Sequence, residues 1–522
     1  MKKILILGGG TAGWMAANLF AKMLNRRSYA ITLVESPQLG IIGVGEGSTP
    51  QLKKFFDILD IPESEWMPAC HATYKNGISF VDWTEHTQHN RYFHPFPSPF
   101  DRATGSAFLY HSKLRSQGMD VPVCPDDFFL SAKLAQRKLS PKPKPNKPQI
   151  PLNYAYHFDS AKLGDFLSIK AKEAGVTHIE DELSSHKSAI NYDEFGNICS
   201  LSMQSGNKYS ADLFIDCTGF SSRLIQQSLK VPFHSFSDML FNDAAVAIPT
   251  KSESTLPSET KAQALSNGWS WHIPLTNRTG NGYVYCSKYI SAEEAELELL
   301  KSLGYESKVE YESANPNLPA IKHLRMKVGQ VTKHWHKNVL ALGLSQGFIE
   351  PLEATALHLV QETILQFIQL LGEPVDVLSN TVEDEKAREL KDKFNDKIRK
   401  RFEGVRDYIV AHYKLNTRND SQYWIDNRNN QQLSPQLEAV LESWYSARDI
   451  NTVLNNYQMT SYYPAVSWFC LLAGYGAFPE IKTENKLPEH AMRQMQEYIL
   501  NNTQHFEEHS VALASLSEHK PN

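Results

Sequence analysis

The stretch KKILILGGGTAGWMAANLFAKML, residues 2–24, decides the fold class of this 522-residue chain. A short apolar run, a cluster of glycines and a segment with apolar residues at helical spacing predict a buried strand, a tight turn and a helix. Gly8, Gly10 and Gly13 form the pattern G-x-G-x-x-G. In that pattern the first glycine permits the turn, the second lets a pyrophosphate approach the backbone, and the third lets helix and strand pack closely.

The start of this helix and the strand after it complete a nucleotide-binding pattern. Thr11 and Ala12 would open the helix, whose free N–H groups and positive dipole end suit a phosphate. A second apolar strand, AITLVE (residues 30–35), ends in Glu35, an acid placed to accept hydrogen bonds from a ribose. The order predicts a dinucleotide site; the alternative is a glycine-rich turn that binds no ligand.

Two later segments repeat the step from an apolar strand to a glycine turn. The first is LFIDCTGFSSRL (213–224), with Asp216 and Gly219, and the second begins NVLALGLSQGF (338–348), with Gly343 and Leu344. Three such turns spread over the first 350 residues favour a long cofactor across an interrupted domain. That pattern suits FAD better than NAD.

Composition narrows the class of protein. Hydrophobic residues make up 41% and charged residues 21%, which is typical of a soluble globular chain. The net charge of −5 and the lack of a basic block argue against a nucleic-acid partner. Six scattered cysteines without a CxxC pair predict reduced thiols and no metal site. No stretch is long enough to span a membrane or to act as a signal peptide, so we expect a cytoplasmic protein.

The chain divides by composition into two modules. Residues 1–375 read as an α/β cofactor-binding module with insertions near 80–150, and residues 376–522 as a helical substrate-binding module without a clear strand. A helix is predicted over 353–371 from its apolar face and from Gly372 and Pro374 after it. The proline- and lysine-rich segment 139–151 is predicted to be an exposed loop.

These motifs together resemble the FAD-dependent tryptophan halogenase family over roughly residues 3–475. The most specific is GWSWHIP (268–274), which fits the family pattern G-W-x-W-x-I-P; the others that carry the resemblance are GGGTAGWMAA (8–17), GVGEGSTP (43–50), YKNGISFVDW (74–83), YAYHFD (154–159), DCTG (216–219), GFIEPLEAT (347–355) and VRDYIVAHY (405–413).

The resemblance implies a Rossmann-type, flavoprotein monooxygenase-like α/β module that binds FAD, with Gly45 among its contacts, and a mainly helical substrate module. It also implies FADH2 from a separate flavin reductase, a halide ion that is oxidised to hypohalous acid, and a small aromatic substrate. A homodimer is left open. In an extended segment Trp269 and Trp271 share one face. They would form a barrier that only a small oxidant passes; the alternative is that both are simply core packing.

Two residues are implied as catalytic. Lys75 matches the family's lysine, which either donates a hydrogen bond to hypohalous acid as an ammonium or forms a haloamine as a neutral amine; the sequence leaves both open. Glu353 matches the carboxylate that stabilises the cationic ring and accepts its proton. Glu350 is the rival, and a plain role of Glu353 at the start of the next helix is the alternative.

The remaining site residues follow from the same resemblance. Thr355 and Ala356 correspond to the pair beside which the family holds halide, although many relatives have glycine at the second position. His94 and Phe96 resemble residues that line the aromatic pocket. Tryptophan-specific members carry a glutamate and then a phenylalanine–tryptophan pair where this chain has Gln458, Tyr462 and Tyr463, so free tryptophan is not assured as the substrate.

Two other functions fit parts of the pattern. An FAD-dependent aromatic monooxygenase of the same fold would carry a glycine–aspartate motif where this chain reads LALGLSQGF (340–348), and it would lack the tryptophan pair. A non-catalytic flavin-binding protein would have no need of Lys75 together with Glu353.

Overall fold

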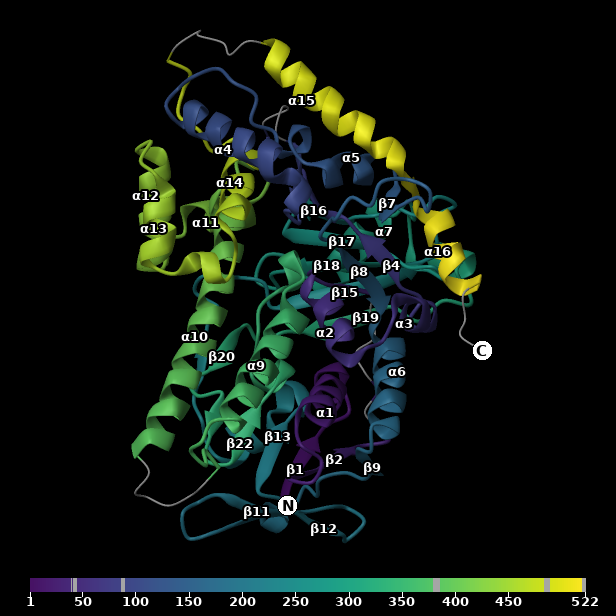
Figure 1. Ribbon diagram of the computed structural model, residues 1–522, viewed down its shortest axis with the longest axis vertical. Helices are drawn as coiled ribbons and strands as arrows, with labels where there is room; N and C mark the ends of the chain where they lie inside the picture. The colour runs from purple at the N-terminus through teal and green to yellow at the C-terminus, as the bar shows by residue number, and fades with distance from the viewer. Residues whose placement is uncertain (39, 41–44, 86–89, 379–384, 483–488, 519–522) are drawn as a thin grey trace.

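The computed structural model describes residues 1–38, 40, 45–85, 90–378, 385–482 and 489–518 (Figure 1). Of the motif GVGEGSTP, residues 43 and 44 therefore lie outside the described part. Strand β1 (Lys2–Leu7), helix α1 (Thr11–Met23) and strand β2 (Tyr29–Glu35) follow one another. The strand–turn–helix–strand order predicted at the start of the chain is confirmed.

A six-stranded sheet carries all three glycine turns. Its order is β21-β22-β13-β1-β2-β9, and β22 (Val339–Ala341), β13 (Leu213–Asp216), β1, β2 and β9 (Thr177–Glu180) run parallel. Only β21 (Trp335–His336) is antiparallel to its neighbour. The turns after β1, β13 and β22 therefore lie side by side at the carboxyl edge of the sheet, the usual ligand edge of such folds.

A seven-stranded, mostly antiparallel sheet holds the tryptophan pair. Its order is β19-β15-β18-β17-β16-β5-β6, with β19 (Lys322–Arg325), β15 (Ala244–Thr250), β18 (Thr279–Tyr285), β17 (Gly268–Pro274), β16 (Thr260–Leu265), β5 (Gly77–Val81) and β6 (Arg91–Pro95). Along β17 Trp269 and Trp271 are buried while Ser270 and His272 are half-buried, so the predicted sharing of one face is confirmed.

A small three-stranded sheet lies against β17 and β18. Strand β8 (Ala155–Asp159) pairs on one side with β3 (Gly45–Gly47) and on the other with β4 (Thr73–Lys75), both antiparallel. Contacts join β3 to both β17 and β18. On the far side of β8, the hydroxyl of Thr73 in β4 donates to the carbonyl oxygen of Pro274, which links the strand that ends in Lys75 to the end of the strand that carries the two tryptophans.

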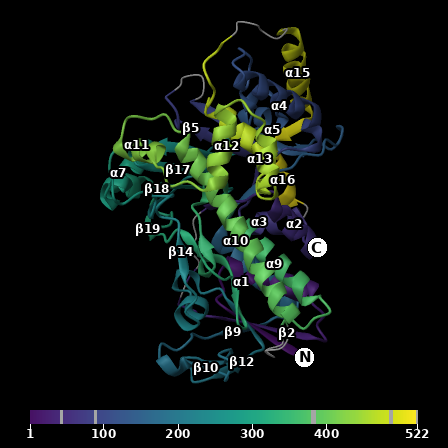
Figure 2. The same cartoon turned by 90° about the vertical axis from the view of Figure 1, so that its left-hand side faces the viewer.

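Helices cover the two sheets and continue their core. The long helix α10 (Glu385–Lys414) runs beside α9 (Ala356–Leu371), as Figures 1 and 2 both show. Phe394 of α10 contacts Phe367 of α9 and Trp335 of β21 through ring edges. One hydrophobic core therefore includes residues on both sides of position 375, and a division of the chain there remains a prediction.

The helices after α10 pack together with segments that are distant in the sequence. Helices α11 (Gln422–Asn429), α12 (Pro435–Tyr445), α13 (Ile450–Asn456) and α14 (Ala465–Gly474) follow α10. Helix α4 (Arg102–Ser116) packs against α14, and α5 (Leu130–Gln136) packs against α15 (Glu489–Asn502). The last helix, α16 (His509–Glu518), returns to α3 (Glu63–Ala69), as Figure 1 shows.

Three local expectations were wrong. Residues Leu139–Pro143 are not loop but strand β7, which pairs with β24 (Phe506–Glu508). The same pair corrects the expectation that no strand follows position 380, and its register is set by partners too distant for a local pattern to reveal. Helix α9 begins at Ala356 instead of 353, because Pro351–Glu353 forms a 3-10 turn and Ala354 takes a left-handed conformation (φ 55°).

Candidate active site

The glycine turns form a cradle whose geometry fits a dinucleotide. Gly8 has φ 113°, and a Cβ on it would lie 2.3 Å from the carbonyl oxygen of Cys217. A Cβ on Gly13 would lie 2.0 Å from the oxygen of Gly8, so helix α1 approaches β1 as the fingerprint requires. Among the described residues, no other atom would lie within 4 Å of a Cβ added to Gly10 or Gly219. The first-turn N–H groups of α1, at Thr11 and Ala12, are therefore accessible to a pyrophosphate, and the residues fit FAD.

Most of the other predicted cofactor residues lie at the same edge, but Gly45 lies in β3, where a Cβ on it would contact Ile273 and Gly280 of the seven-stranded sheet. A Cβ on Gly343 would lie 2.8 Å from that of Ala12, so the turn containing Gly343 and Leu344 touches the start of α1. Glu35 is the last residue of β2, and one of its carboxylate oxygens lies 2.7 Å from Nε2 of His178. The Asp216 carboxylate accepts from the backbone N–H groups of residues 218, 224 and 225 and from the Thr218 hydroxyl. Asp216 therefore shapes its turn, and direct contacts of these acids with FAD remain predictions.

Lys75 is completely buried at the end of β4. Its Nζ donates to the carbonyl oxygen of Ser48, 3.1 Å away, and lies 5.7 Å from the ring centre of Phe96. Burial lowers the pKa of Lys75 to about 7, although the negative charge of Glu353 acts in the opposite direction. A buried amine that gains and loses its proton near neutral pH beside an aromatic ring is a candidate for chemistry.

Glu353 is held between two buried histidines. Nδ1 of His94, on β6, lies 3.0 Å from each carboxylate oxygen, and Nε2 of His412, on α10, lies 3.1 Å from Oε1. Because an ionised carboxylate only accepts, both histidines donate to it. Burial alone would raise the pKa of Glu353, but attraction and hydrogen bonds from His94 and His412 outweigh it and lower the pKa to about 2. The carboxylate is therefore ionised at neutral pH.

The remaining nitrogens of the two histidines are also bonded. Nε2 of His94 lies 2.9 Å from the Ser467 hydroxyl, and Nδ1 of His412 lies 3.0 Å from the Tyr475 hydroxyl. Burial lowers the pKa of His412 despite the neighbouring carboxylate. A neutral His412 then accepts from Tyr475 and donates to Glu353, which fixes its tautomer and its ring orientation.

Glu350 belongs to a different network. Its Oε2 accepts from Nε1 of Trp269 at 3.0 Å, Nδ2 of Asn242 at 2.8 Å and the hydroxyl of Tyr413 at 2.7 Å. Burial raises the pKa of Glu350 despite these donors. Glu350 therefore anchors the first tryptophan of the pair, whereas Glu353, three residues on, faces the histidines.

The two tryptophans lie next to each other and are tightly packed. Their ring centres are 6.3 Å apart at an angle of 59°. Trp271 lies over Gly282 of β18, where a Cβ would come within 2.0 Å of the indole. Nε1 of Trp271 has no hydrogen-bond partner among the described residues. The pair forms a continuous indole surface that depends on a glycine behind it.

The structure brings some of the predicted substrate residues together and leaves others apart. The ring of Tyr463 stacks on that of Tyr408, with centres 3.7 Å apart, and the Tyr408 ring lies 6.0 Å from that of His94. Thr355 is buried at the start of α9, followed by an exposed Ala356. The side chain of Gln458 is exposed.

Tyr462 packs elsewhere. Its ring covers Gly404 of α10 and lies beside the guanidinium of Arg401, 5.7 Å from it. The structure therefore does not bring Tyr462 or Gln458 into the Glu353 cluster, and their role with substrate remains a prediction.

Sequence reasoning missed three members of the cluster: His412, Tyr408 and Ser467. The first two stand in the quoted motif VRDYIVAHY at a spacing of four, which on a helix places both on one face. This spacing could have identified both residues from the sequence. Ser467 lies in α14 and gives no comparable signal.

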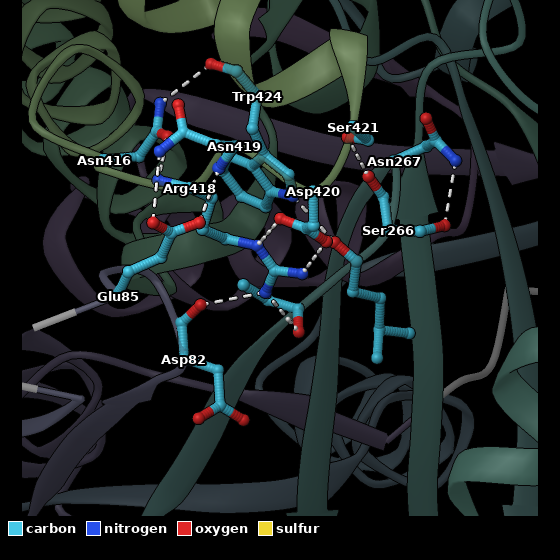
Figure 3. A network of polar contacts seen from close by, with 12 residues as sticks. Asp82, Glu85, Ser266, Asn267, Asn416, Arg418, Asn419, Asp420, Ser421 and Trp424 are labelled. Atoms are coloured by element: carbon cyan, nitrogen blue, oxygen red, sulfur yellow. Dashed lines mark hydrogen bonds and ion pairs between the residues drawn. The ribbon is translucent and has the colours of Figure 1, made fainter. Parts of the chain in front are cut away.

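A polar network fixes the element that carries His412 (Figure 3). Arg418, in the turn after α10, donates to the carbonyl oxygens of Asp82 and Ala264 and pairs with the Asp420 carboxylate. Glu85 accepts from the backbone and side chain of Asn419. These contacts tie the end of α10, which carries His412, to the segment after β5. Strand β5 pairs with β6, which carries His94, so the two histidines are held in fixed positions relative to each other.

Comparison with known proteins places this geometry in a family. The tryptophan halogenase family model matches residues 3–488. The chain is 34% identical over 506 residues to the tryptophan 6-halogenase SttH of Streptomyces toxytricini, covering 91% of this chain and 89% of that protein. It is 32% identical over 510 residues to the tryptophan 7-halogenase RebH of Lentzea aerocolonigenes, covering 92% and 90%.

Solved structures agree. The crystal structure of SttH superposes with a TM-score of 0.82 at 30% identity, covering 99% of this chain and 100% of that one. The flavin-dependent halogenase BrvH from Brevundimonas sp. BAL3 superposes with a TM-score of 0.79 at 27% identity and 99% coverage of both. No helix in the described part of this chain is long and apolar enough to cross a membrane. The chain belongs to the tryptophan halogenase family and is a flavin-dependent halogenase with FAD as its cofactor.

Proposed function

We propose that the protein uses chloride or bromide to halogenate an indole-type aromatic substrate, with hypohalous acid directed onto the ring by Lys75. The observation that carries this proposal is that Lys75 and Glu353, from distant parts of the chain, are both almost completely buried and lie close enough for the charge of Glu353 to act on the lysine. One side chain can donate a proton near neutral pH and the other remains an ionised acceptor. Electrophilic substitution needs both.

The residues that would hold the cofactor and the halide lie at the starts of two helices, α1 and α9. Flavin-dependent halogenases of this family generally take reduced FAD from a reductase and use a halide ion. When bound, reduced FAD supplies the activation of oxygen that oxidises the halide. The first turn of α1 would hold the pyrophosphate, and the start of α9, at Thr355 and Ala356, would hold the halide through backbone N–H groups.

The transfer then uses residues of this chain alone. The ammonium of Lys75 donates a hydrogen bond to the oxygen of hypohalous acid. The ring attacks the halogen, so a carbon–halogen bond forms and the oxygen–halogen bond breaks. The leaving oxygen takes a proton from Lys75 and departs as water. Glu353 accepts the proton that the cationic ring loses, which restores aromaticity.

The contacts of the two glutamates support this assignment of roles. All three donors to Glu350 belong to the scaffold around Trp269, so that carboxylate has a structural task. Glu353 is held by two histidines, and the ring of His94 lies beside the stacked pair Tyr408 and Tyr463. An acceptor beside an aromatic pocket is the arrangement that deprotonation of a ring requires.

The surroundings of the pocket favour indole over an amino acid. SttH and RebH are named as tryptophan halogenases, and an amino acid brings an ammonium and a carboxylate that each need a partner. Here Gln458 is exposed and Tyr462 packs on Gly404, so neither offers a contact near His94. Stacking remains available through Tyr463 and Phe96.

A direct assay tests the proposal. The protein is supplied with FAD, a flavin reductase, NADH, oxygen and either chloride or bromide, together with a panel of indoles and phenols. Mass spectrometry should detect halogen isotope patterns on an indole, and the Lys75→Ala variant should give none. A hydroxylated product would support the monooxygenase alternative, and no product of either kind across the panel would support a non-catalytic flavin protein.

A further inference from the structure

Two polar side chains face the same spot above Gly47. A Cβ placed on Gly47 would lie 3.1 Å from Nζ of Lys75, 3.4 Å from Oγ1 of Thr260 and 3.7 Å from Cβ of Ala354. Thr260 is the first residue of β16 and is buried. The ammonium of Lys75 and the hydroxyl of Thr260 therefore approach the same point beside the Gly47 backbone, with the methyl group of Ala354 on its third side.

The hydroxyl of Thr260 has a fixed orientation. Thr73 donates its hydroxyl proton to the carbonyl oxygen of Pro274 at 2.7 Å, so its oxygen must accept from Nδ1 of His157 at 3.0 Å. Burial, together with the charge of Lys75, lowers the pKa of His157 well below its usual range, so this histidine is neutral. Its Nε2 is then an acceptor, and Thr260, 2.9 Å away, donates to it.

The consequence is a pair of opposite hydrogen-bonding groups. With its proton committed to His157, Thr260 can present only lone pairs to the space above Gly47. Lys75 can present only protons there. Hypohalous acid has one O–H donor and an oxygen that accepts, so it matches both groups at once.

We propose that Thr260, oriented by His157, is a second binding residue for hypohalous acid and accepts its O–H hydrogen bond while Lys75 donates to its oxygen. This inference rests on the function proposed above. The two bonds fix the oxygen and leave the halogen facing away from both groups, toward the ring that attacks it. The same hold keeps the oxidant from diffusing away before the ring arrives.

The same hydrogen bonds also fix Lys75 relative to β17, the strand that carries both tryptophans. Pro274 ends strand β17, which carries both tryptophans, and Thr73 lies two residues before Lys75 on β4. The hydrogen bonds from Thr260 through His157 and Thr73 to Pro274 therefore link the space above Gly47 to the end of the tryptophan strand. His157 acts here as a positioning residue.

The test compares Thr260→Val, which keeps the shape and removes the acceptor, with Thr260→Ser, which keeps the hydroxyl. Oxygen uptake, halogenated indole and oxidant trapped by added monochlorodimedone are measured together, with FAD binding and thermal unfolding as checks on folding. We expect Thr260→Val to lower the product formed per oxygen by about tenfold, the scale of one lost hydrogen bond. Trapped oxidant should rise while oxygen uptake and FAD binding stay unchanged. Thr260→Ser should form as much halogenated product per oxygen consumed as the natural protein.

A second variant covers the case in which Thr260→Val fails to fold. Gly47→Ala places a methyl group 3.1 Å from Nζ of Lys75 and 3.4 Å from Oγ1 of Thr260, between the two groups, so it should give the same loss of product per oxygen. Gly105→Ala in α4, whose added methyl would meet its nearest atom at 3.6 Å, is the matched control. Natural coupling in a folded Thr260→Val or Gly47→Ala protein would overturn the inference. If the natural protein forms neither product nor trapped oxidant, it is the proposed function that fails instead.

Discussion

Nδ1 of His94 lies 3.0 Å from both carboxylate oxygens of Glu353, although the two residues are 259 positions apart in the chain. His412, from a third segment, donates to the same carboxylate. The acid thus gains two donors in a site where burial would otherwise favour its neutral form. This arrangement keeps a proton acceptor ionised near the stacked rings of Tyr408 and Tyr463.

Glu353→Gln keeps the shape of the side chain and removes the charge. We expect turnover to fall by about a hundredfold, as for the loss of a general base, with FAD binding unchanged. Glu350→Gln is the matched comparison, since it alters the carboxylate that holds Trp269, and its loss of turnover should be much smaller. A larger loss in Glu350→Gln than in Glu353→Gln would reverse our assignment.

His412→Phe removes one of the donors that hold the pKa of Glu353 low. A carboxylate with a lowered pKa stays active until the pH falls through that pKa, so losing the donor should move the acid limb of the turnover profile to higher pH. Tyr475→Phe removes only the group that orients His412 and should move the limb less. The check is turnover against pH for all three proteins; an unmoved limb in His412→Phe would exclude this role.

The loss of the Lys75 proton should also appear in the dependence of turnover on pH. Its pKa is lowered to about 7 by burial, so the ammonium loses its proton as the pH rises through that value. If the ammonium is the acting form, as proposed, turnover should decline above about pH 7. A rise over the same range would favour the haloamine route. Lys75→Ala should abolish product yet keep FAD binding and oxygen uptake, whereas Lys53→Ala, which removes a surface lysine paired with Asp57, should change nothing.

The barrier can be disturbed without touching a tryptophan. A methyl at position 282 would come within 2.0 Å of the Trp271 indole, so Gly282→Ala must displace that ring. We expect less halogenated product per oxygen consumed and either trapped hypohalous acid or hydroxylated substrate, as for a protein with both Trp269 and Trp271 changed to Ala. Gly105→Ala is again the control. Unaltered coupling in both barrier variants would leave the tryptophans only a packing role.

The cofactor side of the molecule was predictable because its signals are local. A strand, a glycine turn, a helix and a terminal acid stand within residues 2–35, and each constrains the next. The pairing of Glu353 with His94 and His412 was not predictable, because a hydrogen bond between segments leaves no spacing in the sequence. The strand at 139–143 was missed for the same reason: its partner is Phe506–Glu508, and prolines and lysines in the segment favour a loop when read alone.

The choice between indole and free tryptophan depends on the polar groups around Glu353. A free amino acid would place an ammonium and a carboxylate in a region whose two histidines are already paired: His94 with Glu353 and Ser467, and His412 with Glu353 and Tyr475. Burying either charge without a partner is costly, whereas indole needs only the stacking that Tyr463 and Phe96 can provide. We therefore expect indole, or a simple substituted indole, to be halogenated more efficiently than free L-tryptophan.

A competition between equal concentrations of indole and tryptophan, with both products quantified by mass, measures this preference directly. A ring held by stacking alone is oriented loosely, so attack should fall at its most electron-rich carbon. Replacing Tyr463 with Leu should weaken binding of indole and tryptophan alike, because both lose the same stacking partner; Tyr462→Leu, on the face of α10 near Arg401, is the matched control and should leave the ratio and the rates unchanged. A clear preference for tryptophan, with a single isomer on the benzene ring, would mean that residues outside this cluster bind the amino-acid end.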